Sequence, residues 1–91
     1  MLRITTNNNG HTLVLQLEGR LEGPWVSVLE QCWSNALPRL RGRRLCVDLN
    51  GVTHVDPPGK ARLAEMYATG VELIGEGIET KALVAEIVGE S

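Results

Sequence analysis

The residues best suited to chemistry form one short run, Asp-Pro-Pro-Gly at positions 56–59, followed closely by Lys60 and Arg62. An aspartate in this position can cap a helix, because its carboxylate accepts hydrogen bonds from the free N–H groups of the first turn. Proline is tolerated in that turn, where its missing N–H would have no intrahelical partner. The two cations could instead hold an anion at the helix start, but the prolines remove N–H groups that would contact it. The run therefore predicts a helix cap first and an anion site second.

Four arginines form a second charged feature, Arg39, Arg41, Arg43 and Arg44 around Gly42. A solvated loop is the main interpretation, and docking onto an acidic partner or a phosphate is the alternative. The cluster lacks interleaved aromatic residues, and the net charge of the chain is −2. Neither property favours nucleic acid, so no nucleic-acid partner is expected.

The remaining reactive side chains lack the partners that catalysis or metal binding requires. His11 and His54 have no second ligand at metal-binding spacing, so no metal site is expected. The candidate nucleophiles, none of which has a base at a recognisable spacing, are Ser27, Cys32, Ser34 and Thr53. The sequence contains no glycine-rich phosphate cradle. We therefore predict that the chain is not an enzyme and uses no cofactor.

Composition indicates a single small domain over residues 1–91. Apolar residues make up 43% of the chain and charged residues 22%, as in soluble globular proteins. No apolar run approaches the roughly 20 residues that span a bilayer, so direct membrane insertion is not expected. The N-terminal stretch has no apolar signal-peptide core, which predicts a cytoplasmic chain. In that reducing compartment, Cys32 and Cys46 are expected to be buried thiols.

The apolar pattern predicts the elements that position these side chains. Strands are expected over 2–6, 12–18, 45–49 and 71–74. The turn at 7–10 makes the first two strands antiparallel, and Asn50-Gly51 is expected to form a turn after the third. The stripe of the first helix consists of Trp25, Leu29, Cys32 and Ala36, and Pro38 stops this helix. The second helix is predicted from Asp56 to Gly70, and the third is capped or opened by Thr80 and ends at Gly89.

This order of elements predicts an α/β fold. Strands separated by helices pair in parallel through right-handed crossovers, which gives a mixed four-stranded sheet with an N-terminal antiparallel hairpin. Alternation within the strands indicates that helices cover mainly one face of the sheet. Val14 and Cys46 lie on strands whose other face is partly open, and a homodimer through that face is a further expectation.

The segment 47–70 resembles the core of the STAS domain, the module named for sulfate transporters and anti-sigma factor antagonists. In that family a strand ends in the pattern DL-x-x-V-x-x-[apolar]-D, which here consists of Asp48, Leu49, Val52, Val55 and Asp56. The family's upstream G-x-L-[DE] passage is similar to Gly19, Leu21 and Glu22. The resemblance covers roughly 13–87 and implies a STAS-like (SpoIIAA-like) fold.

One departure from the family pattern bears directly on function. The family's phosphorylatable hydroxyl precedes the glycine, and that position is Pro58 here, with Pro57 in place of the preceding serine. Neither proline can accept a phosphate. Either the loop binds its partner constitutively, or the site has drifted and lost its original partner. Thr53 is the nearest substitute acceptor, although a loop threonine bonded to its own backbone is the better interpretation.

The resemblance implies a non-catalytic bacterial regulatory domain that acts through protein–protein interaction. The expected contact residues are Asp56, Pro57, Pro58, Gly59, Lys60 and Arg62. The first partner class is an anti-sigma factor of the serine-kinase type, in signalling. The alternative is a transporter ATPase, with the chain as the STAS subunit of an ABC-type lipid-transport assembly. A third hypothesis is a small-ligand or nucleotide sensor that uses the helix start together with the arginine cluster.

Overall fold

The computed structural model describes residues 1–90. Its elements are β1 (Leu2–Asn8), β2 (Thr12–Leu21), α1 (Trp25–Ala36), the 3-10 turn η1 (Leu37–Arg39), β3 (Arg44–Val55), α2 (Pro57–Ala68), β4 (Glu72–Ile74) and α3 (Ile78–Glu90). The sheet has the strand order β1-β2-β3-β4; β1 and β2 are antiparallel, and both other pairs are parallel. The predicted mixed sheet with an N-terminal hairpin is therefore confirmed.

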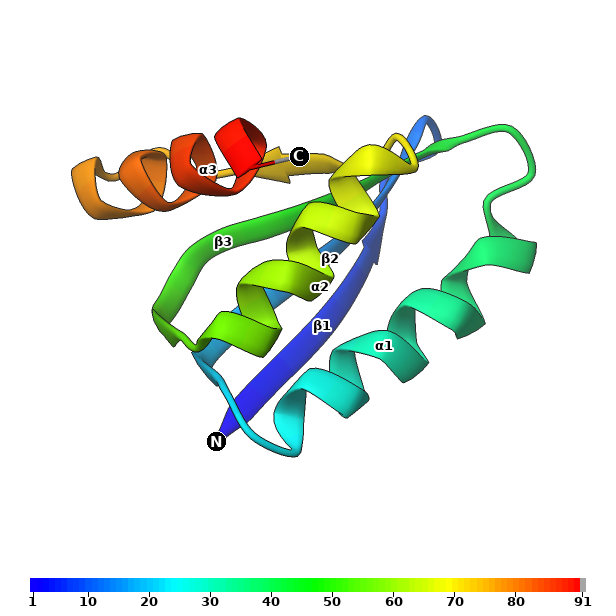
Figure 1. Cartoon of the computed structure of the whole chain (residues 1–91). Coiled ribbons are helices and arrows are strands. Elements are labelled where there is room, and N and C mark those ends of the chain that lie inside the picture. The colour runs from blue at the N-terminus through cyan, green and yellow to red at the C-terminus, as the bar shows by residue number, and fades with distance from the viewer. Residues whose placement is uncertain (91) are drawn as a thin grey trace.

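The three helices lie on one side of the sheet, with α2 between α1 and α3 (Figure 1). Alternate residues of β2, namely Leu13, Leu15 and Leu17, are buried against them. The fully buried side chains are Leu15, Leu17, Leu21, Leu29, Val47, Leu49, Leu63, Met66 and Ile87. This core rests on aliphatic packing because the chain contains no phenylalanine. Within the described part of the chain, no helix is long and apolar enough to cross a membrane.

The other face of the sheet carries Cys46 beside the polar pair Gln16 and Asp48. Cys46 is buried as predicted, whereas Cys32 on α1 is only half-buried, contrary to the prediction. Burial, with a hydrogen bond from the Cys46 thiol to Glu72 (3.3 Å), raises the pKa of that thiol to about 11. The thiol therefore stays protonated at neutral pH. The homodimer expected through this face stays a prediction.

β3 runs six residues further than the alternation predicted. Asn50-Gly51 does not end the strand, because the pairing with β2 shifts register at this point, from Gln16 opposite Asp48 to Glu18 opposite Gly51. A Cβ at Gly51 would lie 2.9 Å from the carbonyl oxygen of Leu17, so the two backbones approach closely here. The bulge lets the strand continue to Val55 and places the following residue at the end of β2.

The two ends of α3 differ from the prediction, whereas the C-terminal end of α2 agrees with it. α3 begins at Ile78 and runs through Gly89, so Thr80 does not open it and Gly89 does not end it. The Lys81 N–H donates to the Gly77 carbonyl (2.8 Å), so the helix begins at Ile78, two residues before the predicted start. Gly70 follows the end of α2 with φ +103°, in agreement with the predicted glycine stop.

Candidate docking site at the start of α2

Asp56 caps α2 as the sequence predicts. Its backbone is extended (φ −80°, ψ 169°), and its Oδ1 accepts a hydrogen bond from the Gly59 N–H at 2.8 Å. Pro57 and Pro58 occupy the first helical positions, and both are exposed. Gly59 is buried behind them, because a Cβ there would lie 2.9 Å from the Leu21 carbonyl oxygen. The helix tip is thus held closely against the end of β2, and its prolines face solvent.

The same carboxylate makes a second contact that sequence spacing could not reveal. Asp56 Oδ2 accepts from the Gly23 N–H at 2.9 Å, although the two residues are 33 positions apart. The Asp56 N–H in turn donates to the Leu21 carbonyl at 3.1 Å. These two N–H donors, Gly23 first and Gly59 second, hold the pKa of Asp56 below its ordinary value of 3.8. One side chain therefore joins the β2–α1 loop to the start of α2.

The lowered pKa of Asp56 predicts a pH dependence of stability. Because the folded pKa lies below the unfolded value, this stabilisation is present above about pH 4 and is lost as the pH falls through the folded pKa. The Asp56→Asn variant keeps one acceptor oxygen, so it should lower the Tm by about 5 °C at pH 7. Its Tm should also fall less than that of the parent chain between about pH 5 and about pH 2. Thermal unfolding followed by circular dichroism measures both, and parallel Tm curves for the two chains would contradict the assignment.

Charged side chains flank this tip on the β2 side. Arg20 forms an ion pair with Glu22, and His54 Nε2 lies 4.0 Å from a Glu22 carboxylate oxygen. The pair with Arg20 lowers the pKa of Glu22 and raises that of Arg20. All three side chains are substantially exposed, so a partner that approaches the tip meets them as well.

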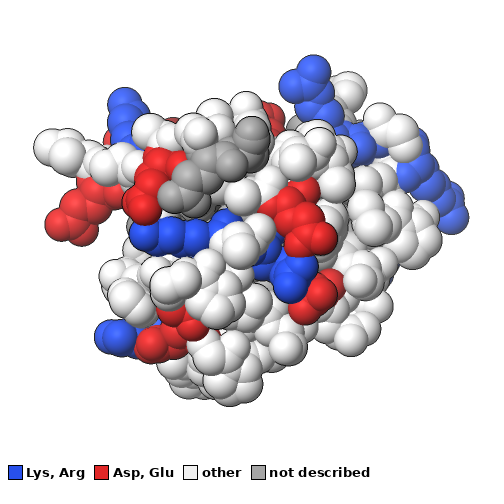
Figure 2. All heavy atoms as spheres, viewed as in Figure 1, with Lys and Arg blue, Asp and Glu red and all other residues white. Residues whose placement is uncertain are grey.

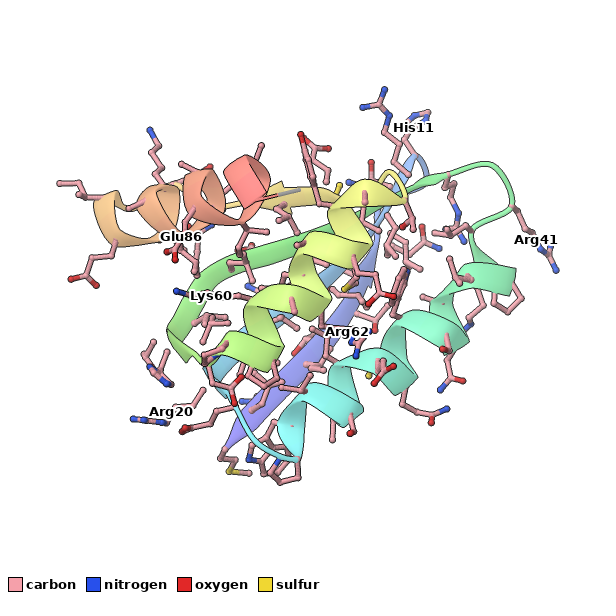
Figure 3. All side chains as sticks on the ribbon, viewed as in Figure 1. His11, Arg20, Arg41, Lys60, Arg62 and Glu86 are labelled. Atoms are coloured by element: carbon pink, nitrogen blue, oxygen red, sulfur yellow. The ribbon has the colours of Figure 1, made fainter. Side chains whose placement is uncertain are left out.

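Lys60 and Arg62 reach neighbouring helices, and neither is brought to the tip itself. Lys60 Nζ lies 2.8 Å from a Glu86 carboxylate oxygen on α3 (Figure 3). Arg62 pairs with Glu65 on its own helix and lies 3.8 Å from Glu30 on α1. These pairs link α2 to both neighbouring helices. The roles of Lys60 and Arg62 in partner contact stay predictions.

Thr53 lies within β3, which corrects its interpretation as a loop threonine. Its hydroxyl donates across the sheet to the Gly19 carbonyl oxygen at 3.2 Å, and it does not bond its own local backbone. The correction follows from the bulge at Gly51, which extends the strand past the predicted turn.

Ile78 is an exposed apolar residue at this end of the fold that the sequence pattern did not single out. Its side chain is 91% exposed at the first position of α3. Because β3 and β4 are parallel, the helices that follow them start at the same end of the sheet (Figure 1). The only sequence signal was an apolar residue before the predicted stripe of α3. We call Asp56 and the exposed residues Pro57, Pro58 and Ile78, which lie at this end of the sheet, the tip surface; Gly59 is buried behind them, and its contact with a partner stays a prediction.

Comparisons with known proteins agree with this architecture. The family model described as "Mlab, STAS domain" matches residues 4–79, and the chain therefore belongs to the STAS domain family. A comparison with curated proteins finds no match.

Three solved structures illustrate the shared fold. The structure of Mglu has a TM-score of 0.64 at 22% identity and covers 82% of this chain, which spans only 19% of Mglu. The antisigma-factor antagonist STAS domain from Rhodobacter sphaeroides has a TM-score of 0.56 at 16% identity, with 87% and 89% of the two chains covered. The unphosphorylated anti-sigma factor antagonist SpoIIAA has a TM-score of 0.56 at 13% identity, with 96% and 99% covered. At these identities the likeness shows the fold alone.

Proposed function

We propose that this STAS domain is a non-catalytic interaction module, similar to an anti-sigma factor antagonist, that docks a protein partner through the tip surface and is not switched there by phosphorylation. The observation that carries the proposal is the pair of exposed prolines, Pro57 and Pro58, on a helix start that Asp56 holds by two hydrogen bonds. A module of this kind would present one surface at all times.

The chemistry of the tip supports a permanent binding state. Phosphorylation of a hydroxyl would add about −1.5 to −2 charges at neutral pH and could drive a partner away. Proline has no hydroxyl, and its ring fixes φ, so the tip neither accepts the charge nor samples many conformations. A rigid exposed tip loses little conformational entropy on binding, which favours affinity. An anti-sigma factor of the serine-kinase type is the first partner class under this proposal.

The second candidate function is the STAS subunit of an ABC-type lipid-transport assembly, with the transporter ATPase as partner. The missing hydroxyls favour it, because a permanently associated subunit needs no phosphate switch at its contact. The tip surface would serve the same docking role in either assembly.

The nucleotide-sensor hypothesis gains no support from the geometry. It required the helix start and the arginine cluster to act on one ligand. Arg44 begins β3, and Asp56 follows its last residue, so these features lie at opposite ends of a 12-residue strand. One small molecule cannot contact both.

Affinity capture from native lysate of the source organism, followed by mass spectrometry, tests the proposal. We expect the immobilised chain to retain an anti-sigma factor kinase or a transporter ATPase, and Ile78→Ser to reduce that retention about tenfold. The Ser34→Ala variant, at an exposed position on α1, is the matched control and should retain the partner fully. Capture of neither class, or equal capture by Ile78→Ser and the parent chain, would refute it. Ile78 is so exposed that its substitution leaves the core intact.

A further inference from the structure

The end of the sheet opposite the tip surface carries an unbalanced positive charge. Arg39, Arg41, Arg43 and Arg44, here called the arginine pole, lie between α1 and the start of β3. They supply four positive charges in a chain whose total is −2, so the rest of the chain carries −6. Figure 2 shows the blue side chains at the right-hand end standing apart from the red ones, and Figure 3 labels Arg41 at that end.

The arginine pole has no carboxylate partners among the side chains that the structure describes. Arg20, Lys60 and Arg62, by contrast, each face a glutamate. Arg43 is turned inward, and its Nε donates to the Leu40 carbonyl at 3.0 Å, which fixes the loop. Arg39, Arg41 and Arg44 are exposed. Three guanidinium groups are therefore free to meet an external anion.

A groove lies beside two of these arginines, Arg43 and Arg44, which are part of its lining. A hollow of about 350 Å³ lies between the ends of α1 and α2, and its lining includes Trp33, Leu37, Leu40, Leu45, Val71 and Arg44. A second hollow of about 720 Å³, more open to solvent, continues from it past Arg44, Tyr67 and Glu72. The two share Arg44, Gly70 and Val71, so they form one groove. Leu37 and Tyr67 are 50% and 38% exposed along it.

Trp33 adds a hydrogen-bond donor without an acceptor. Its ring lines the groove, and its Nε1 is buried with no hydrogen-bond partner in the described part of the chain. Buried tryptophan N–H groups usually have a partner. A bound segment would therefore contact the part of the Trp33 ring that lines the groove, and not this buried N–H.

We propose that this groove binds an acidic segment of a partner protein, in which carboxylates face Arg44 and the neighbouring Arg41 and an apolar side chain enters the hollow beside Trp33. The arginine forks match carboxylates in charge and geometry. The carboxylate of Glu72 at the far end of the groove would repel an acidic group there. The acidic end of the bound segment should therefore lie at the arginines, and its other end near Glu72. A concave groove suits a side chain better than the flat surface of a membrane. This site lies at the opposite end of β3 from the tip surface, so the two can be occupied independently.

A designed peptide tests the inference by fluorescence anisotropy with the full chain. The probe is a short fluorescein-labelled peptide in which glutamates flank a leucine–phenylalanine pair, and glutamines replace the glutamates in the control peptide. We expect the acidic peptide to bind with a Kd of about 10–100 μM and the control about tenfold more weakly. Raising NaCl from about 50 mM to about 500 mM should weaken binding of the acidic peptide several-fold.

Variants locate the bound peptide. Arg41→Gln combined with Arg44→Gln should weaken binding about tenfold, and Leu37→Ser should weaken it several-fold. Arg3→Gln, which removes an exposed charge at the other end of the fold, is the matched control and should leave the affinity unchanged. Ile78→Ser should also leave it unchanged, which separates this site from the tip surface.

Three results would overturn the inference. The first is no binding of the acidic peptide. The second is a failure of discrimination, in which the control peptide binds as well as the acidic one or the arginine double variant binds as tightly as the parent chain. The third is arginine-dependent retention on vesicles of phosphatidylcholine and phosphatidylglycerol without peptide binding, which would assign the groove to a membrane surface.

Discussion

The Pro58→Glu substitution is expected to reduce retention of the partner at the tip surface at least about tenfold while leaving the fold intact. Pro58 is exposed in the first turn of α2, so a glutamate there would place a fixed negative charge at the position that the family resemblance aligns with a phosphorylated hydroxyl. A charge that loses water without gaining a partner weakens binding by several kcal/mol. The fold should tolerate it, because an acidic residue near a helix N-terminus interacts favourably with the helix dipole.

Two readouts separate charge from shape in this experiment. Pro58→Gln has nearly the same shape as Pro58→Glu without the charge, so it should retain most of the partner. Thermal unfolding should give both variants a Tm close to that of the parent chain. Equal loss of retention in the two variants would show that the proline ring, and not neutrality, matters. Full retention by Pro58→Glu would place the docking surface elsewhere.

The Gly59→Ala substitution is expected to destabilise the fold by about 2 kcal/mol, equivalent to a fall in Tm of about 10 °C. The added Cβ would lie 2.9 Å from the Leu21 carbonyl oxygen and 2.9 Å from Val55 Cγ1. It would also lie 3.0 Å from the Asp56 oxygen that caps the helix. The contact on the Leu21 side is a backbone oxygen, which cannot rotate away as a side chain could. The start of α2 must therefore shift away from β2. Urea unfolding followed by circular dichroism measures the loss of stability.

Gly89→Ala is the matched control for Gly59→Ala. Gly89 also lies within a helix, but nothing stands within 4 Å of the position where its Cβ would be. Alanine has the higher helix propensity, so this variant should be unchanged or more stable by up to about 1 kcal/mol. Equal stability of Gly59→Ala and the parent chain would mean that α2 does not press against β2 as described.

Local patterns in the sequence predicted most of the elements. Leu13, Leu15 and Leu17 alternate with residues that are less buried, and this alternation predicted β2. The prediction holds because the sheet buries one face of the strand, which takes up every second side chain. The Asp-Pro-Pro-Gly run predicted the start of α2 because capping depends on residues only three positions apart. β3 ends six residues later than predicted and α3 begins two residues earlier, since both boundaries depend on contacts with other elements.

Only the local part of the candidate site could be predicted from the sequence, because the rest depends on contacts between elements. The cap formed by Asp56 is local, but its bond to Gly23 spans 33 positions and exists only because β2 and β3 run side by side. The pairs of Lys60 with Glu86 and of Arg62 with Glu30 depend on α2 lying between α1 and α3. No residue spacing within the sequence predicts these two ion pairs.

The sequence by itself determined the order and type of the elements, the capped start of α2 and the absence of a hydroxyl at positions 57 and 58, because each depends on residue identity or on neighbours along the chain. Only the tertiary structure decided that Asp56 joins the β2–α1 loop to the start of α2, that Ile78 shares an end of the sheet with it, and that Arg43 and Arg44 border a groove at the other end. Those arrangements follow from parallel strand pairing, which places residues far apart in the chain at a common edge.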